Sequence, residues 1–258
     1  MLKTLKPMLL EHLTAITNAT SIEELWRLHT AKMAEYGFDR LLYGFSHFLT
    51  ESSLGDPRDF VLLSNHTPEY VGGYIKERRL FDAPMLKWAL DNEGACSWSL
   101  ISELMLKQHL TVREKRVLAF NLSHDVTTGY SISFKSISAR AKGAIGLTGS
   151  PGLTQAEVDG IWDKHGAHIL LMNNVAHLKI LNLPYRPSFR KTLTKRQRET
   201  LQWAADGKTM QDTAYLMGLT TATVEKHLRL ARIAMHVDTT AQAILKASMQ
   251  NEIYALDY

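Results

Sequence analysis

Two prolines in the last third of this chain divide it. Pro184 and Pro187 lie in the segment LNLPYRPSFRKT (181–192), where their locked backbone and missing N–H groups prevent one continuous helix. Basic residues begin to accumulate at the same point. Residues 190–236 hold nine Lys and Arg against four Asp and Glu, although the net charge of the whole chain is only +4. The sequence therefore predicts one domain over 1–182, a linker over 183–190 and a basic domain over 191–258.

The composition is that of a globular protein, with 45% hydrophobic and 22% charged residues. No run of about 18 apolar residues is present, and Pro7, Glu11 and His12 interrupt the apolar N-terminal stretch. We therefore expect neither a membrane span nor a signal peptide. The single cysteine, Cys96, can form no disulfide within the chain and fits a reducing compartment. We expect a cytoplasmic protein with no membrane partner and no cysteine-based zinc site.

Hydrophobic periodicity predicts the elements of the first domain. A period near 3.6 residues runs from Thr154 to Asn182 and indicates a long amphipathic helix, and a capping pattern at Ser21 opens a helix towards Tyr36. Apolar runs indicate strands at 40–48, 59–66, 127–136 and 143–149, with helices near 68–80, 84–92 and 111–123. Because strands and helices do not alternate regularly, we expect an α+β fold, an α-β-α sandwich around an antiparallel sheet.

The second domain is predicted to be all-α, with four short helices over 193–249. Thr194, Thr209 and Thr220 stand at helix starts, and Gly207 and Gly218 stand at helix ends. Two helices joined by a short turn that contains a glycine form the helix-turn-helix arrangement, in which the second helix enters the DNA major groove. The pattern therefore favours a DNA-binding domain.

The third of these helices has an apolar face and a basic face. Its predicted inward stripe is Val224, Leu228, Ala231 and Met235. Lys226 and Arg229 lie roughly opposite, where they can donate to guanine or to phosphates. Thr221, Thr223 and Arg232 at the flanks are placed for contacts with the DNA backbone. The alternative is a small helical bundle whose basic face is merely solvated.

The run LTKRQRETLQWAADGKT, followed by DTAYLMGLTTATVEKHLRLARIAM, resembles the LuxR/FixJ-type helix-turn-helix across roughly residues 190–250. The matching positions are Leu193, Thr194, Arg196, Glu199, Leu201, Trp203, Gly207, Lys208, Thr209, Ala214, Thr223, Val224 and His227. Four residues depart from the family's usual ones, namely Gln197, Leu230, Ala234 and Thr240. The resemblance implies a homodimer on double-stranded DNA with a palindromic operator. In the family, one face of the last helix helps to pair two DNA-binding domains, and that face is here Ala241, Ile244, Leu245, Ser248 and Met249.

The first domain resembles the acyl-homoserine-lactone-binding domain of LuxR-type quorum-sensing regulators over about residues 60–150. The resemblance rests on PEYVGGYIKERRLFDAPMLKW, SWS and TTGYSISF. Tyr70 stands where the family has Trp, and the matching positions are Tyr74, Asp82, Pro84, Trp98 and Gly129. The family's Asp and Pro are adjacent, whereas Ala83 separates them here. The resemblance implies a ligand-sensing and dimerisation domain in a transcriptional regulator, with an N-acyl homoserine lactone as autoinducer and no catalytic residue or cofactor.

The polar groups of such a ligand fit these side chains. The hydroxyl groups of Tyr70 and Tyr74 can donate to the lactone and amide carbonyls. The Asp82 carboxylate can accept the amide N–H, and Trp98 supplies a flat wall for the lactone ring. Between sheet and helices, the predicted walls for the acyl tail are Tyr43, Phe60, Leu62 and Met85. Without the resemblance, the two tyrosines at i, i+4 fit a buried helix face better, and Gly129 fits a strand bulge.

Two other functions stay open on the sequence. One is a LuxR-type regulator that is ligand-independent or senses a metabolite other than a lactone. The other is an enzyme-like metabolite-binding domain fused to the helix-turn-helix. The commonest hydrolase and nucleotide motifs, GxSxG, the P-loop and GxGxxG, do not occur. His165 and His168 share a helix face but have no acidic third ligand at helical spacing, so we expect neither a metal site nor an enzyme.

Overall fold

The computed structural model describes residues 2–50, 53–136, 138–185 and 193–254. The chain divides into two compact units, Met1–Ile180 and Leu181–Tyr258. This division falls two residues before the expected end of the first domain. Most of the expected linker, residues 186–190, lies outside the described residues.

The first unit is built on a five-stranded antiparallel sheet. Its strands are β1 (Phe38–Ser46), β2 (Val61–Ser64), β3 (Gly94–Ser97), β4 (Gly129–Ser133) and β5 (Lys142–Gly149), and their order is β2-β1-β5-β4-β3. The four strands expected from the sequence are present. The edge strand β3 was not predicted, because its four residues Gly-Ala-Cys-Ser lack the aromatic and β-branched side chains that mark strands.

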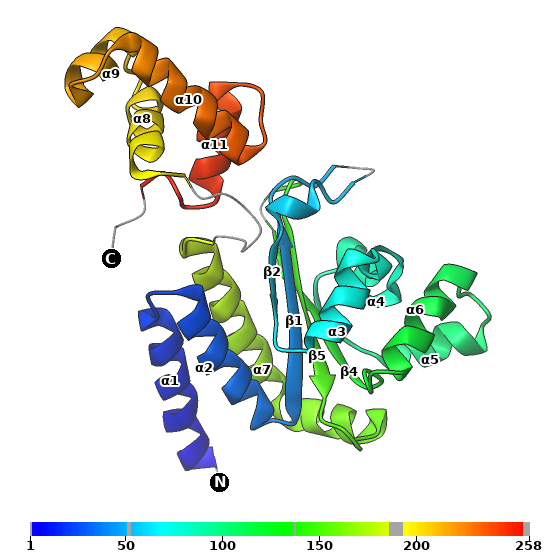
Figure 1. Cartoon of the computed structure of the whole chain (residues 1–258). Coiled ribbons are helices and arrows are strands. Elements are labelled where there is room, and N and C mark those ends of the chain that lie inside the picture. The colour runs from blue at the N-terminus through cyan, green and yellow to red at the C-terminus, as the bar shows by residue number, and fades with distance from the viewer. Residues whose placement is uncertain (1, 51–52, 137, 186–192, 255–258) are drawn as a thin grey trace. The chain divides into compact units, whose positions relative to one another are not determined.

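Helices cover both faces of this sheet. One face carries α1 (Leu2–Asn18), α2 (Ile22–Ala34) and the 28-residue helix α7 (Gln155–Asn182). The other carries α3 (Pro68–Val71), α4 (Pro84–Asp91), α5 (Ser99–Leu106) and α6 (Val112–Leu122), as Figure 1 shows. All five residues of β4 are buried, as expected for a strand enclosed on both sides. The predicted α-β-α sandwich is therefore confirmed.

The helix expected over 68–80 is broken, and that prediction was wrong. After α3 the backbone continues as a π-helix over Gly72–Lys76, takes a left-handed conformation at Arg78 (φ 60°) and then forms a 3-10 turn over Arg79–Asp82. Gly73 explains part of this irregularity, because a Cβ atom there would lie 2.6 Å from the Phe120 ring. The close approach of α6 thus shapes the segment that carries Tyr70 and Tyr74.

The second unit consists of four helices, α8 (Lys195–Ala205), α9 (Met210–Met217), α10 (Thr221–Met235) and α11 (Thr240–Met249). The hydroxyls of Thr194, Thr209 and Thr220 accept hydrogen bonds from backbone N–H groups at the starts of α8, α9 and α10. Gly218 ends α9 at φ 66°, in the left-handed region that glycine adopts without strain. The predicted inward stripe of α10 is buried, with exposures of 0–6% at Val224, Leu228, Ala231 and Met235. The predicted four-helix arrangement is confirmed.

Candidate functional site

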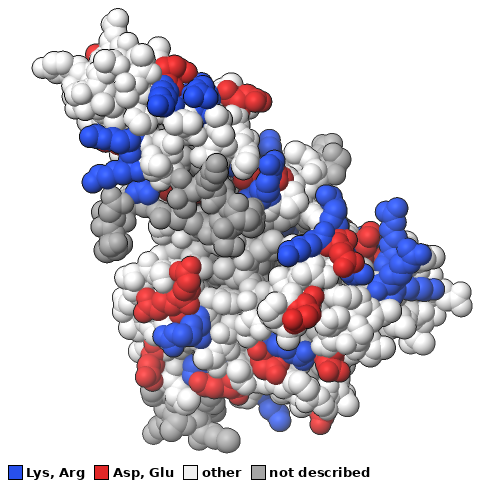
Figure 2. All heavy atoms as spheres, viewed as in Figure 1, with Lys and Arg blue, Asp and Glu red and all other residues white. Residues whose placement is uncertain are grey.

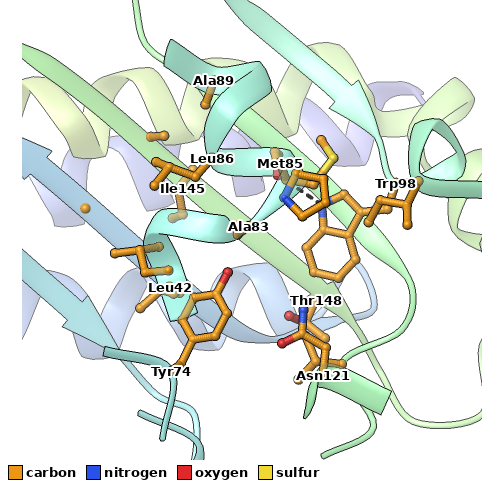
Figure 3. Close-up of a pocket in the computed structure, with 18 of the residues that line it drawn as sticks. Leu42, Tyr74, Ala83, Met85, Leu86, Ala89, Trp98, Asn121, Ile145 and Thr148 are labelled. Atoms are coloured by element: carbon orange, nitrogen blue, oxygen red, sulfur yellow. Dashed lines mark hydrogen bonds between the residues drawn. The ribbon is translucent and has the colours of Figure 1, made fainter. Parts of the chain in front are cut away.

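A cavity of about 520 Å³ lies in the first unit, between the sheet and the helices of its α3–α6 face. Most of its wall is apolar, as ligand cavities usually are. Six residues that the sequence singled out contribute to the lining: Phe60, Leu62, Tyr70, Tyr74, Met85 and Trp98. Figure 3 shows Tyr74, Trp98 and Met85 around this space, together with apolar side chains such as Leu42, Leu86 and Ile145.

Tyr70 is held by the protein itself. Its ring is 4% exposed and stacks on His66, with ring centroids 4.5 Å apart, and on Tyr74 at 5.2 Å. Its hydroxyl donates to Oδ1 of Asn121 at 3.1 Å. The donor that we expected to meet a lactone carbonyl therefore already has a partner on α6, and Tyr70 serves the cavity mainly as a wall.

Tyr74 is the tyrosine with an unused hydroxyl. Its side chain is 7% exposed, and among the described residues its O–H has no hydrogen-bond partner. In Figure 3 this hydroxyl points into the cavity, away from the backbone that carries it. Burial raises the pKa of Tyr74 above its ordinary value, so the phenol stays protonated and remains a donor. A donor that faces the cavity and has no partner among the described residues is free to meet a ligand acceptor at this point.

Trp98 lies at the corner between β3 and α5. Its Nε1–H donates to Oγ of Ser131 on β4 at 2.9 Å, which fixes the ring against the sheet. Gly129 makes this packing possible, since a Cβ at that position would clash with the Leu147 carbonyl and would lie 3.1 Å from the indole ring. Gly129 itself is not among the lining residues. Gly129, which we expected to bind the ligand, is instead the position at which the Leu147 carbonyl and the Trp98 ring come close to the β4 backbone.

The expectation that Tyr43 lines the cavity is wrong. Side chains alternate along a strand, and on β1 it is Leu42 and Gly44 that belong to the cavity side. Tyr43 is buried on the opposite face, where its hydroxyl lies 2.8 Å from Nδ1 of His177 on α7 and its ring contacts Phe134. Because helices cover both faces of the sheet, burial along β1 gives no indication of the side on which a residue lies.

Asp82 also lies outside the lining, so its expected contact with a ligand stays a prediction that the cavity wall does not support. Helix α4 begins at Pro84, so the residue that directly precedes the proline is Ala83, which is 3% exposed and does line the cavity. Asp82 is one step further back, at the end of the 3-10 turn, with a partly exposed side chain. The extra alanine between Asp and Pro therefore puts a methyl group at this part of the wall.

The polar lining residues that sequence reasoning missed include His66, Asn121 and Thr148. Helical spacing held a signal for Asn121, which follows the buried Val117 by four residues on α6. Burial and the charge of Arg40 lower the pKa of His66 to about 4, which keeps its imidazole neutral near pH 7. Its Nε2 lies 3.5 Å from the Thr148 hydroxyl.

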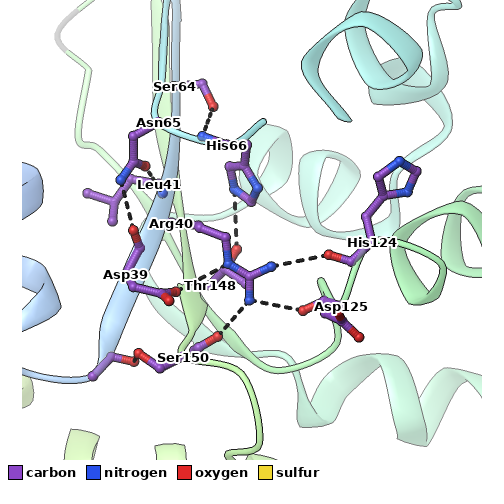
Figure 4. A network of polar contacts seen from close by, with 12 residues as sticks. Asp39, Arg40, Leu41, Ser64, Asn65, His66, His124, Asp125, Thr148 and Ser150 are labelled. Atoms are coloured by element: carbon purple, nitrogen blue, oxygen red, sulfur yellow. Dashed lines mark hydrogen bonds and ion pairs between the residues drawn. The ribbon is translucent and has the colours of Figure 1, made fainter. Parts of the chain in front are cut away.

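Arg40 ties together the segments around this corner of the cavity. Its guanidinium donates to the backbone carbonyls of His124, Asp125 and Gly149 at 3.1–3.2 Å, as drawn in Figure 4. These bonds join β1 and β5 to the loop after α6, the helix that carries Asn121. Arg40 thus fixes the geometry of the polar wall without being part of the lining.

Charge in the lining has one sign. Of the described residues that form it, two are lysines, Lys115 and Lys142, and none is an aspartate or glutamate. Among the described parts of the chain, no three His, Cys, Asp or Glu side chains are grouped so as to hold a metal ion. No helix of the described chain is long and apolar enough to cross a membrane. The cavity therefore suits a largely apolar, neutral or anionic molecule.

The second unit exposes much of its basic face. Thr221, Lys226 and Arg229 on α10 are exposed, and Figure 2 shows Lys and Arg side chains projecting from this unit. The other two residues singled out on α10 already have partners. The Thr223 hydroxyl lies 2.9 Å from that of Thr220, and Arg232 contacts Glu225 at 2.9 Å and Thr240 at 3.0 Å.

The outer face of α11 is also apolar in part. Ala241, Leu245, Ser248 and Met249 are exposed, with 53% exposure at Leu245, whereas Ile244 packs against the core of the unit. Four of the five residues expected on a pairing face are thus available on the surface of this unit.

Two family descriptions match the sequence, "Autoinducer binding domain" over residues 21–180 and "Bacterial regulatory proteins, luxR family" over residues 191–247. The transcriptional activator protein AnoR of Acinetobacter nosocomialis is 24% identical over 244 residues, which span 92% of this chain and 95% of AnoR. The transcriptional activator protein LuxR of Aliivibrio fischeri is 21% identical over 201 residues, 76% of each chain.

Solved structures share the fold. SdiA in complex with octanoyl-rac-glycerol gives a TM-score of 0.53 at 16% identity, over 98% of both chains. The N-acylhomoserine lactone dependent factor CepR2 of Burkholderia cenocepacia gives the same TM-score and identity, over 68% of this chain and 95% of that one. The match to SdiA extends over nearly the whole chain, and the match to CepR2 over about two thirds of it.

Proposed function

Because the chain belongs to the LuxR family of bacterial regulatory proteins and carries an autoinducer-binding domain, we propose that it binds an N-acyl homoserine lactone in the cavity of its first unit and responds by altered binding to DNA. The observation that carries this proposal is the Tyr74 hydroxyl, a donor that has no hydrogen-bond partner among the described residues and points into a largely apolar cavity of about 520 Å³. That combination suits a ligand with an acyl tail and a carbonyl-bearing head.

Each part of the ligand has a proposed contact. Tyr74 donates to a carbonyl of the head group, and the Trp98 ring, fixed by its bond to Ser131, forms a flat wall beside it. The acyl tail runs along apolar side chains that include Phe60, Leu62 and Met85. Tyr70 completes the wall with its ring.

The second unit is proposed to bind a palindromic DNA site as a homodimer. Lys226 and Arg229 are the proposed base-reading residues, and Thr221 a backbone contact, because all three are exposed on α10. Thr223 and Arg232 reach phosphates only if their contacts within the unit rearrange. The exposed side chains of α11 are the proposed pairing face.

Ligand extraction tests this proposal. The full chain is produced in a host fed with acyl-homoserine lactones of different tail lengths, purified, and extracted for mass spectrometry. We expect one lactone at near-equimolar amount, and a melting temperature that rises with lactone concentration. Footprinting with and without that lactone should show two half-sites about 10 base pairs apart, or a multiple of that spacing. A protein that binds DNA but is neither loaded nor stabilised by any lactone would refute the ligand assignment.

A further inference from the structure

The described cavity wall has no carboxylate at the point where the chain enters helix α4. Ala83, not Asp82, directly precedes Pro84 and lines the wall, and no carboxylate occurs among the described lining residues. Ala83 and Tyr74 belong to the same buried cluster, and Figure 3 shows both beside the cavity. A methyl group therefore stands near the one tyrosine hydroxyl that is free to meet a ligand.

Three side-chain donors of the lining are left unused around this point. The Tyr74 O–H has no partner among the described residues. The oxygen of Ser131 accepts from the Trp98 indole, so its own proton remains free to be donated. Asn121 uses Oδ1 to accept from Tyr70, and its amide N–H₂ makes no bond within the described chain. These groups together suit a ligand head with several acceptor oxygens.

We infer, on the basis of the proposed function, that this site recognises the carbonyl oxygens of an acylated head group and makes no use of an amide N–H, so that O-acyl esters bind as well as N-acyl amides. The physical reason is the hydrogen bonding of the ligand N–H. A ligand N–H gains binding energy when it meets a good acceptor, and it loses binding energy when it is buried without one. Replacement of that N–H by an ester oxygen removes a donor for which the described lining offers no carboxylate acceptor.

A matched ligand pair tests the inference on the full chain. One ligand is an N-acyl homoserine lactone, and the other is the ester of the same fatty acid with α-hydroxy-γ-butyrolactone, which differs only by oxygen in place of N–H. Titration calorimetry should give dissociation constants within about threefold of each other, because no hydrogen bond distinguishes them. An amide that binds more than about tenfold tighter overturns the inference while it supports lactone sensing. Failure of both ligands to bind refutes the proposed function and the inference with it.

Two variants locate the effect. Asp82→Asn removes the nearby carboxylate, and both dissociation constants should stay at their wild-type values; a selective loss of the amide would mean that Asp82 reaches the ligand. Ala83→Asp puts a carboxylate into the wall, where it should accept the amide N–H and repel the ester oxygen, and the amide should then bind at least about tenfold tighter than the ester. Unchanged ligand preference in a folded Ala83→Asp protein contradicts the inference. If that variant does not fold, the Asp82→Asn comparison decides.

Discussion

Replacement of Tyr74 by Phe separates ligand recognition from fold stability. The change removes one hydroxyl that has no partner among the described residues and keeps the ring that stacks on Tyr70. A neutral hydrogen bond contributes about 0.5–1.5 kcal/mol net, so the dissociation constant for an acyl lactone should rise about 2-fold to 12-fold. Without ligand, the variant should unfold close to the wild-type temperature, because the removed hydroxyl faces the cavity and makes no hydrogen bond to the described residues.

Tyr70→Phe is the matched control, because it deletes the same atom from the neighbouring ring of the stack. Here the lost hydroxyl donates to Asn121 at 3.1 Å, so the ligand-free protein should lose about 1 kcal/mol of unfolding free energy, or roughly 2–4 °C in melting temperature. Its effect on ligand affinity should be smaller than that of Tyr74→Phe.

Thermal melting of both variants, with and without a saturating lactone, measures stability and binding in one experiment. Titration calorimetry then supplies the dissociation constants. The reasoning fails if Tyr74→Phe binds the lactone with wild-type affinity. It also fails if that variant, without ligand, melts as far below the wild type as Tyr70→Phe does.

Three further outcomes are expected. Lys226→Ala or Arg229→Ala should each weaken operator binding by about 1–3 kcal/mol in a gel-shift titration. Arg232→Ala should also lower the melting temperature, because the Arg232 side chain bridges α10 and α11. Leu245→Asp should leave the melting temperature near that of the wild type, because this side chain is 53% exposed, but should shift operator complexes from dimer to monomer; a stable dimer on DNA would place the pairing face elsewhere. Burial is the main cause that lowers the pKa of His29 to about 4, below the ordinary 6.5, so the unfolded chain takes up this proton first. Stability should therefore be constant above about pH 7 and fall from about pH 6.5 to pH 4, by up to about 1.4 kcal/mol per pH unit from this group, and urea titrations of His29→Gln should show a shallower fall.

The helix-turn-helix unit was predictable because its determinants are local. Threonine caps, the left-handed glycine at 218 and the i, i+4, i+7 spacing of α10 act within a few residues of one another. The long helix α7 was predictable for the same reason. Such signals can be read within one segment, without the positions of the other segments.

Which side chains face the cavity was decided by the tertiary structure. Tyr43 lies on the side of β1 that faces α7, away from the cavity. The sequence could not show this, because both faces of the strand are covered and an apolar residue is buried on either one. Tyr70 differs from Tyr74 only because a partner 51 residues away, Asn121, takes its hydroxyl. The sequence alone determined that an aromatic pair lies near the Asp-Ala-Pro segment. Only tertiary packing decided that the Tyr74 hydroxyl faces the cavity without a partner among the described residues and that the alanine before Pro84, not Asp82, lines the wall, because both depend on contacts between segments distant in the chain.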